Sequence, residues 1–409
     1  MAARRGGNGV ASTTTEKTGI IFCQFVTTSC VRDYVMKICF VAEFYPPHIG
    51  GGEIFIQKLV EGLAQGGHEC IVITSRTEKK LPAIEEKNNL KVVRIRIPSI
   101  LSRFWFSLFA TYKIILFARH CDIIHGASYG GAIPSFLGAK LLRKKSILMV
   151  YEFMGGLWKN LESNWFLAQF YQTTERIFAH LSFDKFIAIS RYTRNCLRFL
   201  GVPDHKLDIV YGGENTELLK TGKNPLELRK EIGFTPEDFI YLVYGRAGIS
   251  KGIEFFVEAI PLITKRIPTA KFILILTKSG NKTWNSIMDK LRKLPSPMYR
   301  IIPGMPREEL SDFLCLADCI VIPSLSEGFG FAALEACTLK KRVVATDVGS
   351  LPEVIFGEYV LVKPGSPQAL AEGCCRSFFG NMDYGPPKAF RWEETVSRCR
   401  KIYDEILNR

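Results

Sequence analysis

Two cations flank a turn in the second half of the chain and could bind one anionic group together. In the stretch YGRAGISKGIEFF, residues 244–256, Arg246 follows an apolar run and Lys251 precedes a helical pattern. A turn between a strand and a helix exposes backbone N–H groups at the helix start, where anions are favoured. A guanidinium and an ammonium beside such a turn suit a diphosphate. Solvated surface cations are the alternative interpretation.

Two glutamates, Glu327 and Glu335, lie eight positions apart in PSLSEGFGFAALEA, residues 323–336. Across a continuous helix this separation would be a rise of about 12 Å, too long for the paired carboxylates of a glycosidase, which stand roughly 5 to 9.5 Å apart. The two groups would therefore contact different parts of one long ligand. Carboxylates accept hydrogen bonds from sugar hydroxyls, and a nucleotide-sugar carries hydroxyls at both ends. Structural or surface roles for both glutamates are the alternative.

Glycines mark two further turns. The sequence G-F-G-F-A-A within the second stretch is close to the turn by which Rossmann folds bind a dinucleotide. That turn belongs to the first strand and helix of its domain, whereas Gly328 and Gly330 lie about five strands into theirs, which weakens a dehydrogenase hypothesis. The run Gly50, Gly51 and Gly52 precedes a helical pattern and could bring bare backbone close to an anion; a flexible connector is its alternative.

The elements that must position these groups follow from an alternation of short β-branched runs with helical patterns, beginning at Met36. We predict a first series of strands at residues 37–42, 69–74, 91–97, 123–125, 146–151 and 185–189. A second series is predicted at 207–211, 240–244, 271–276, 299–302, 319–322, 342–346 and 359–362. The pattern predicts an α/β chain with two Rossmann-like, doubly wound domains facing across a cleft.

Domain boundaries are predicted at breaks in this pattern. Residues 36–203 form the first domain and residues 204–390 the second, while 391–409 form an amphipathic helix that packs back toward the first. Residues 1–35 contain a short apolar run without a cleavage-site pattern, so we predict a disordered extension or a misplaced start. The sequence contains no run of 18 uncharged apolar residues, so we predict no transmembrane span.

Composition limits the partners. The 409 residues carry a net charge of +14, and residues 36–203 hold 22 Lys and Arg against 12 Asp and Glu, whereas residues 204–409 hold 28 against 26. A basic first half suits phosphate-bearing substrates or anionic lipid. Nucleic acid is not a predicted partner, because no predicted helix has a face made only of basic residues. The 12 cysteines show no C-x-x-C spacing, which favours buried reduced thiols in the cytoplasm over a zinc site or a disulfide framework.

The stretch LSRFWFSLFATYKIILFA, residues 101–118, predicts a helix in the basic half with Leu101, Phe104, Trp105, Leu108, Tyr112 and Ile115 at helical spacing. These side chains could pack on the sheet or lie in a membrane interface, and both interpretations stay open, with core packing the simpler one. The basic cluster at residues 141–146 adds weight to peripheral contact with an anionic membrane.

Taken in order, these motifs resemble one family. They are the glycine-rich first turn at 50–52, AISRYTRNCL at 188–197, VYGGENTE, the G-R-x-x-x-x-K-G turn at 245–252, PGMPREEL, the two glutamates, and DVGSLPEVI at 347–355. The set is similar to the retaining, GT-B fold glycosyltransferases of family GT4, over about residues 36–409. The resemblance implies that the second domain binds a nucleotide-sugar and the first domain faces the acceptor.

The resemblance also implies roles for the charged residues of the second domain. Arg246 and Lys251 would be catalytic, because they stabilise the leaving nucleoside diphosphate. Glu335 would accept hydrogen bonds from the ribose, and Glu327 would contact the donor sugar and act as a catalytic group.

The backbone contributes as well in this family. The amides of Phe329 and Gly330 would contact the donor sugar or phosphate, and Gly51 and Gly52 would close over the phosphates from the first domain. Retention is attributed in the family to front-face attack, with the leaving phosphate accepting the acceptor's proton. The resemblance therefore implies neither a metal nor another cofactor, and the sequence has no D-x-D cluster.

The chain departs from the family at the end of the strand ILMVY. A histidine that meets the donor sugar often stands there, and this sequence has Tyr151, followed by Glu152. Tyr151 is a predicted catalytic residue that can donate a hydrogen bond but cannot supply a cation near neutral pH. Glu152 and His125 are predicted on the acceptor side, with a buried structural histidine as the alternative for His125.

These observations predict a cytoplasmic retaining hexosyltransferase, associated with the inner face of a membrane. It would move a sugar from a UDP-, GDP- or ADP-sugar to a saccharide or lipid-linked acceptor. A sugar phosphorylase, a nucleotide-sugar hydrolase and a non-catalytic nucleotide-sugar-binding partner are the alternatives. Release of the sugar to phosphate or water favours the first two, and donor binding without turnover favours the third.

Overall fold

The computed structural model describes residues 34–48, 50–162, 164–214, 222–278 and 281–408. Nearly all of the predicted N-terminal extension lies outside the described residues. Val35 to Arg409 form one compact unit, which contains both predicted series of strands.

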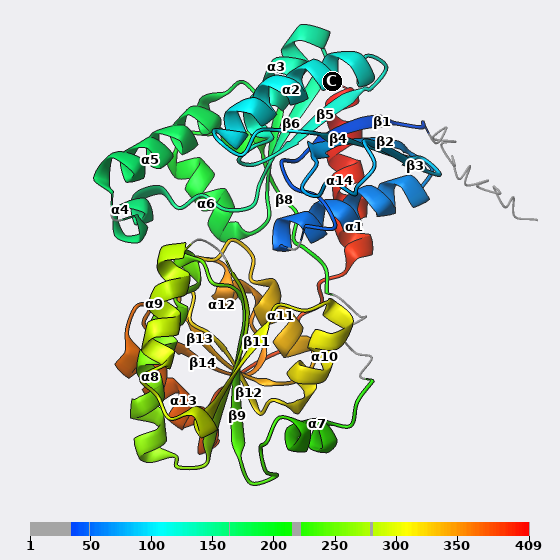
Figure 1. Cartoon of the computed structure of the whole chain (residues 1–409). Coiled ribbons are helices and arrows are strands. Elements are labelled where there is room, and N and C mark those ends of the chain that lie inside the picture. The colour runs from blue at the N-terminus through cyan, green and yellow to red at the C-terminus, as the bar shows by residue number, and fades with distance from the viewer. Residues whose placement is uncertain (1–33, 49, 163, 215–221, 279–280, 409) are drawn as a thin grey trace, which may run out of the picture. The chain divides into compact units, whose positions relative to one another are not determined.

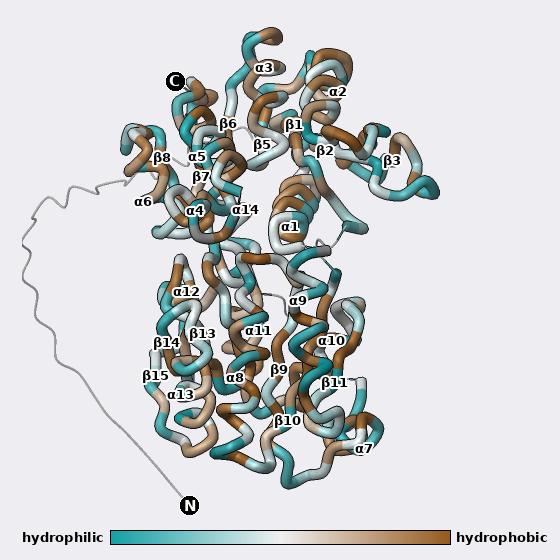
Figure 2. Tube along the Cα trace, turned by 60° about the vertical axis from the view of Figure 1, so that its left-hand side comes forward, coloured by the Kyte–Doolittle hydropathy of each residue, from teal (hydrophilic) through white to brown (hydrophobic). Residues whose placement is uncertain are grey.

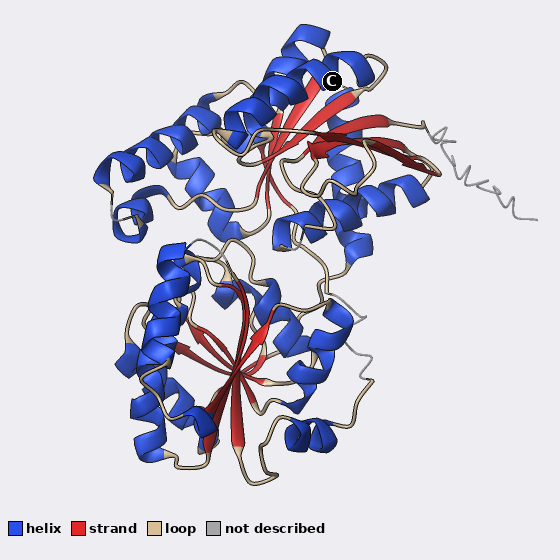
Figure 3. Ribbon diagram, viewed as in Figure 1, coloured by secondary structure: helices blue, strands red, loops and turns tan. Residues whose placement is uncertain are grey.

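Eight strands form the first sheet, in the order β3-β4-β2-β1-β5-β6-β7-β8 (Figures 1 and 3). All neighbours are parallel except β3 and β4. The strands are β1 (Lys37–Val41), β2 (Glu69–Ser75), β3 (Ile84–Lys87), β4 (Leu90–Ile95), β5 (Ile123–Ala127), β6 (Lys145–Val150), β7 (Lys185–Ala188) and β8 (Leu207–Ile209). The central strands are buried on both faces, which explains their nearly continuous apolar sequences.

Seven strands form the second sheet, in the order β11-β10-β9-β12-β13-β14-β15, with only β15 antiparallel. They are β9 (Phe239–Arg246), β10 (Ala270–Thr277), β11 (Tyr299–Pro303), β12 (Cys319–Ile322), β13 (Arg342–Thr346), β14 (Gly357–Val362) and β15 (Asp383–Gly385). Helices cover this sheet as well: α7 (Pro225–Glu231), α8 (Ile253–Arg266), α9 (Asn281–Leu291), α10 (Arg307–Leu316), α11 (Phe331–Thr338), α12 (Leu351–Val354) and α13 (Pro367–Phe378). The prediction of two doubly wound domains is confirmed.

Successive strand residues point to opposite faces of the first sheet. Both faces are apolar, and a layer of helices covers each of them. Ile38 and Phe40 of β1 pack with α1 (Gly51–Gln65) and α14 (Trp392–Leu407). Cys39 and Val41 pack with α2 (Ser102–Phe117) and α3 (Ala132–Leu142). On this second face, residues of β6 and β7 pack with α5 (Trp165–His180) and α6 (Arg191–Phe199), while the short α4 (Trp158–Leu161) precedes α5.

The chain ends in the first domain. Helix α14 packs beside α1, where Gly62 leaves room for Val396, and Tyr403 contacts His125 (Figure 1). Arg398 of the same helix donates to Asp208 of β8 at 2.6 Å.

One strand prediction needs correction, and two strands were not predicted. The sequence pattern places residues 207–209 in the second domain, but β8 pairs in parallel with β7, with Phe186 opposite Leu207. The boundary at residue 204 is therefore wrong, because a strand of three residues does not reveal in the sequence which sheet it extends. The edge strands β3 and β15 are absent from the predicted series; both are short, and most of their residues are exposed.

The helix predicted at residues 101–118 exists as α2, but a different face of it enters the core. Phe106, Ala110 and Ile114 are buried against the sheet, whereas Phe104 and Leu108 of the predicted apolar face are exposed. Core packing is therefore the wrong interpretation for most of that face, because α2 is apolar on more than one side.

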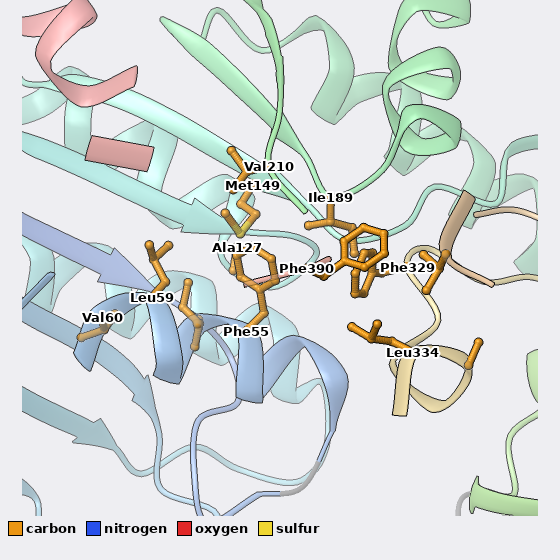
Figure 4. Close-up of a cluster of buried hydrophobic side chains, with 14 of the residues drawn as sticks. Phe55, Leu59, Val60, Ala127, Met149, Ile189, Val210, Phe329, Leu334 and Phe390 are labelled. Atoms are coloured by element: carbon orange, nitrogen blue, oxygen red, sulfur yellow. The ribbon is translucent and has the colours of Figure 1, made fainter. Parts of the chain in front are cut away.

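A continuous apolar cluster joins the two domains. It runs from Phe55 and Leu59 of α1, past Ile189, to Phe329 and Phe390 (Figure 4). The rings of Phe329 and Phe390 lie 5.6 Å apart. This packing supports the turn before α11 directly against the first domain.

Candidate active site

A cavity of about 460 Å³ lies where the carboxyl ends of the two sheets meet. Parallel sheets bind ligands at this edge because the connecting turns present side chains and backbone N–H groups there. Tyr151 and Glu152 line the cavity. So do all of the predicted donor-binding residues, which are Gly51, Gly52, Arg246, Lys251, Glu327, Phe329, Gly330 and Glu335. Residues from separate motifs are thus gathered around one space.

The cation pair comes from the turn after β9. Arg246 is the last residue of that strand and is exposed, while Lys251 ends a short 3-10 turn before α8. The Lys251 ammonium lies 2.7 Å from the carboxylate of Glu327, which also accepts a hydrogen bond from Ser324 at 3.2 Å. A cation and a carboxylate therefore stand side by side, so an anionic group and a hydroxyl could bind next to each other.

The two glutamates occupy different environments. Glu327 lies in the turn before α11, and Glu335 lies inside that helix, where it is buried. The hydroxyl of Tyr244 donates to Glu335 at 2.6 Å. Tyr244 was not predicted as a site residue, and its place near the end of β9, two residues before Arg246, is the signal that could have found it.

The glycines of the G-F-G-F-A-A turn serve the approach of the two domains. A Cβ atom on Gly328 would lie 1.9 Å from the carbonyl oxygen of Tyr151, at the end of β6. Gly330 has φ of +93° and starts α11 in the left-handed region that glycine adopts readily. These glycines are therefore explained by close backbone contact and turn geometry instead of a dinucleotide.

Tyr151 and Glu152 form part of the first-domain wall. The Tyr151 hydroxyl is buried and has no hydrogen-bond partner among the described residues, and burial raises the pKa of this phenol. Glu152 accepts a short hydrogen bond from Ser326 of the second domain. Burial, followed by repulsion from Glu327, raises the pKa of Glu152 to about 7, so this carboxyl group changes charge near neutral pH.

His125 does not line the cavity. Its ring is fully buried, and Nδ1 lies 2.7 Å from the hydroxyl of Tyr403. Burial lowers the pKa of His125 to about 3, so the ring stays neutral. The structural interpretation of this histidine is the one that fits, and the acceptor-side assignment is not supported, because β5 directs the side chain toward α14.

Sequence reasoning missed a buried carboxylate that shapes the same wall. Glu175 of α5 is fully buried and accepts four hydrogen bonds, from Tyr129 (2.6 Å), the N–H groups of Met154 (3.0 Å) and Gly155 (2.7 Å), and the indole of Trp158 (2.9 Å). Three of these donors, from Met154, Gly155 and Trp158, belong to the segment that follows Glu152. Glu175 thereby fixes the chain beside the cavity, and nothing in its helical sequence context signals this role.

Two further acidic residues of the wall were also missed. Glu43 follows β1, and burial raises its pKa although Arg103 lies 3.4 Å away. Glu53 lies in the first turn of α1, 2.8 Å from Nδ1 of His48. Burial opposes the ionisation of Glu53, but hydrogen bonds from His48 and the backbone outweigh it and lower the pKa. Both carboxylates line the cavity close to the predicted phosphate-binding glycines.

Other site chemistry is limited in the described part of the chain. No group of three or more His, Cys, Asp or Glu side chains there could hold a metal ion. The ten cysteines within the described ranges are all free thiols.

Two facing Rossmann-like domains, with a cation pair and carboxylates in the cleft between them, have the architecture of the GT-B fold. A family model described as "Glycosyltransferase Family 4" matches residues 49–218, and one described as "Glycosyl transferases group 1" matches residues 226–376. Together the two models match most of the chain. The chain belongs to the GT4 family of GT-B glycosyltransferases.

Individual relatives agree with this assignment. An uncharacterized glycosyltransferase of Methanocaldococcus jannaschii is 28% identical over 399 residues, covering 90% of this chain and 98% of the relative. One subunit of the human phosphatidylinositol N-acetylglucosaminyltransferase is 21% identical over 402 residues, covering 92% of this chain and 77% of the relative.

Solved structures share the fold. Sucrose-phosphate synthase from Thermosynechococcus elongatus aligns with a TM-score of 0.73 at 19% identity, covering 91% of this chain and 99% of that one. HepE from Anabaena, in complex with UDP-glucose, aligns with a TM-score of 0.69 at 16% identity, covering 91% and 98%.

Proposed function

We propose that this glycosyltransferase is a retaining hexosyltransferase that takes its sugar from a nucleoside diphosphate donor. The observation that carries the proposal is the Lys251–Glu327 pair at 2.7 Å, with Arg246 lining the same cavity. In such an arrangement the cations face a diphosphate while the neighbouring carboxylate accepts a hydrogen bond from the attached sugar.

A UDP-sugar is the first donor to test. One structural relative was solved with UDP-glucose and another, a starch synthase, with ADP, so both bases occur in proteins of this fold. GDP-sugars complete the set. Glu335 would accept from the ribose, while the backbone of Phe329 and Gly330 and the helix start at Gly51 and Gly52 would surround the sugar and the diphosphate.

The reaction would break the bond between the anomeric carbon and the diphosphate oxygen and form a bond to the acceptor oxygen on the same face. The leaving phosphate accepts the acceptor's proton, so no covalent enzyme intermediate is involved. Arg246 and Lys251 stabilise the negative charge that develops on the diphosphate, and Tyr151 and Glu327 orient the sugar. We propose that these cations suffice and that no metal or other cofactor takes part.

The acceptor would be a saccharide or a lipid-linked molecule at the first-domain wall, near Glu152. The name of the human relative includes phosphatidylinositol, which supports a lipid-linked acceptor here as part of the proposal. The basic first half of the chain supports contact with an anionic membrane at the cytoplasmic face.

Calorimetric titration tests the donor site. UDP, GDP, ADP and NAD are titrated in EDTA into the parent protein, into Arg246→Ala/Lys251→Ala and into the control Arg266→Ala. Arg266 lies at the opposite end of α8, paired with Glu372 on the surface. We expect one nucleoside diphosphate to bind the parent and the control, and at least 100-fold weaker binding to the double variant.

The outcomes separate the alternatives. Binding of NAD alone, or equal affinity in the double variant, would overturn the diphosphate site, and a requirement for Mg²⁺ would overturn the metal-free mechanism. With the donor identified, NMR of the product anomer tests retention. Release of sugar to phosphate or water identifies a phosphorylase or a hydrolase, and binding without any turnover identifies a non-catalytic partner.

A further inference from the structure

Two neighbouring helices of the first domain present apolar stripes to solvent. On α2, Phe104, Leu108, Tyr112 and Leu116 are 44–60% exposed, at a spacing of four residues. On α3, three residues at the same spacing, Ile133, Leu137 and Leu141, are 41–64% exposed. Side chains four residues apart lie on one side of a helix, so each helix shows one continuous apolar stripe.

The two stripes form one surface. Helices α2 and α3 pack closely: a Cβ atom on Gly138 would lie 2.5 Å from the side chain of Ile114. In Figure 2, brown hydrophobic segments recur along both helices. We call this surface, made of the seven stripe residues, the α2–α3 face.

Exposure of this kind is absent from the opposite layer of the same sheet. Among the described residues of α1 and α14, none is an exposed large apolar side chain. The exposed positions of α14 are polar and include Glu393, Arg398, Lys401 and Glu405. Helix α5 of the first domain also exposes large apolar side chains, among them Trp165, Phe166 and Phe170, so the contrast is with the α1–α14 layer and not with the whole domain.

The segment that carries the face is mostly positive. Residues 101–145 contain seven Lys and Arg and a single acidic residue, Asp122. The Lys113 ammonium lies over the rings of Tyr112 and Phe117, and that of Lys140 lies over Phe136. No ion pair with a carboxylate of the described chain involves Lys113 or Lys140. The aliphatic stems of such lysines can lie on an apolar surface while the charges reach an anionic layer.

We propose that the α2–α3 face docks the protein on the surface of an anionic bilayer. Apolar stripes framed by cations, with a tyrosine among them, are the composition that an interfacial helix needs. Among the described residues, no helix is long and apolar enough to cross a membrane. A second protein would be the other kind of partner, but the nearly acid-free surroundings favour anionic lipid.

The face is also connected to the cavity. Arg103, in the first turn of α2, lines the cavity, and so do Tyr129 and Gly130, which precede α3. Both stripes thus begin near the cavity wall and run away from it along the helices. Docking would hold the first-domain wall near the lipid headgroups, where a lipid-linked acceptor would lie. This link between docking and acceptor rests on the proposed function.

Vesicle flotation tests the proposal. The parent chain is mixed with vesicles of pure phosphatidylcholine and of phosphatidylcholine with 30% phosphatidylglycerol. The test variant is Leu108→Glu/Leu137→Glu, one substitution in each stripe. The control is Phe379→Glu/Tyr384→Glu, two side chains of the second domain that are 65% and 71% exposed. Thermal unfolding and UDP calorimetry check that each variant remains folded.

We expect the parent and the control to float with the anionic vesicles, with weaker binding in 0.5 M salt, and at least tenfold weaker partition for the test variant. Equal flotation of parent and test variant, or an equal loss in the control, would overturn the proposal. A dimer of the parent that dissociates in the test variant, without any flotation, would assign the face to self-association instead. Flotation of a parent chain that binds none of UDP, GDP and ADP would uphold the docking face and reject the proposed function.

Discussion

The two walls of the cavity are built in different ways. The second-domain wall takes its charged groups from two short stretches, and its cation Lys251 is matched by Glu327 at 2.7 Å. The first-domain wall takes Glu43 from the turn after β1 and the neighbours Tyr151 and Glu152 from the turn after β6, and the pKa of each is raised, mainly by burial. The second wall is thus suited to hold a charged donor, whereas the first contains groups whose charge is sensitive to pH.

The largest effect expected from this comparison belongs to Glu327→Gln. The amide keeps the size of the side chain but removes the charge next to Lys251, so the contact with the donor sugar is weakened while the cation remains. We expect kcat/KM to fall by about 10³ and UDP affinity to change less than threefold. Steady-state kinetics and calorimetry measure the two quantities.

The control for Glu327 is Glu372→Gln, which breaks a surface ion pair with Arg266. It should leave both quantities unchanged. A parallel loss of UDP affinity and turnover in Glu327→Gln would show that this carboxylate supports the cation site instead of the sugar, and the proposed separation of roles would be wrong.

A smaller effect is expected from Glu152→Gln, which changes the first-domain wall. The pKa of Glu152 is raised to about 7 by burial and by Glu327, with Glu175 adding to the shift and Lys251 and Ser326 opposing it. The group is neutral below that pH and negative above it. The affinity for UDP-glucose should therefore fall about threefold to tenfold between pH 6 and pH 8, and Glu152→Gln should abolish this dependence.

UDP-glucose is the suitable probe because its diphosphate carries no terminal phosphate that titrates near pH 6. Glu86→Gln, on the exposed strand β3, is the control and should keep the pH dependence of the parent. An unchanged pH dependence in Glu152→Gln would contradict the assignment and would direct attention to Glu43.

The second-domain wall is easier to predict from the sequence than the first-domain wall, because its charged residues lie close together in the chain. Arg246 with Lys251, and Glu327 with Glu335, lie close together in the chain, so spacing and family resemblance find them without the fold. The first wall depends on long-range contacts. Glu175 reads as an ordinary helix residue until four donors are seen to converge on it.

The fold follows the same rule. Repeated strand and helix patterns predict both doubly wound domains, but no local pattern assigns β8 to the first sheet, because a three-residue strand is defined by its partner β7. Gly328 likewise looks like part of a dinucleotide turn, whereas its lack of a side chain is required by the carbonyl of Tyr151 in the other domain.

Tyr151→Phe is expected to have the smallest effect and tests the first wall most directly. The Tyr151 hydroxyl is buried without a partner in the described part of the chain, while its ring packs 6.0 Å from that of Phe55. Removing an unsatisfied hydroxyl should raise the free energy of unfolding by about 1 kcal/mol. If the hydroxyl donates to the donor sugar, the KM for the donor rises about fivefold and UDP affinity stays constant.

Tyr241→Phe is the matched control: that hydroxyl donates to the carbonyl of Cys374 at 2.7 Å, so its loss should lower stability and leave KM unchanged. Higher stability of Tyr151→Phe with unaltered KM would mean that this tyrosine only fills the wall, and that the first domain reaches the donor through its backbone.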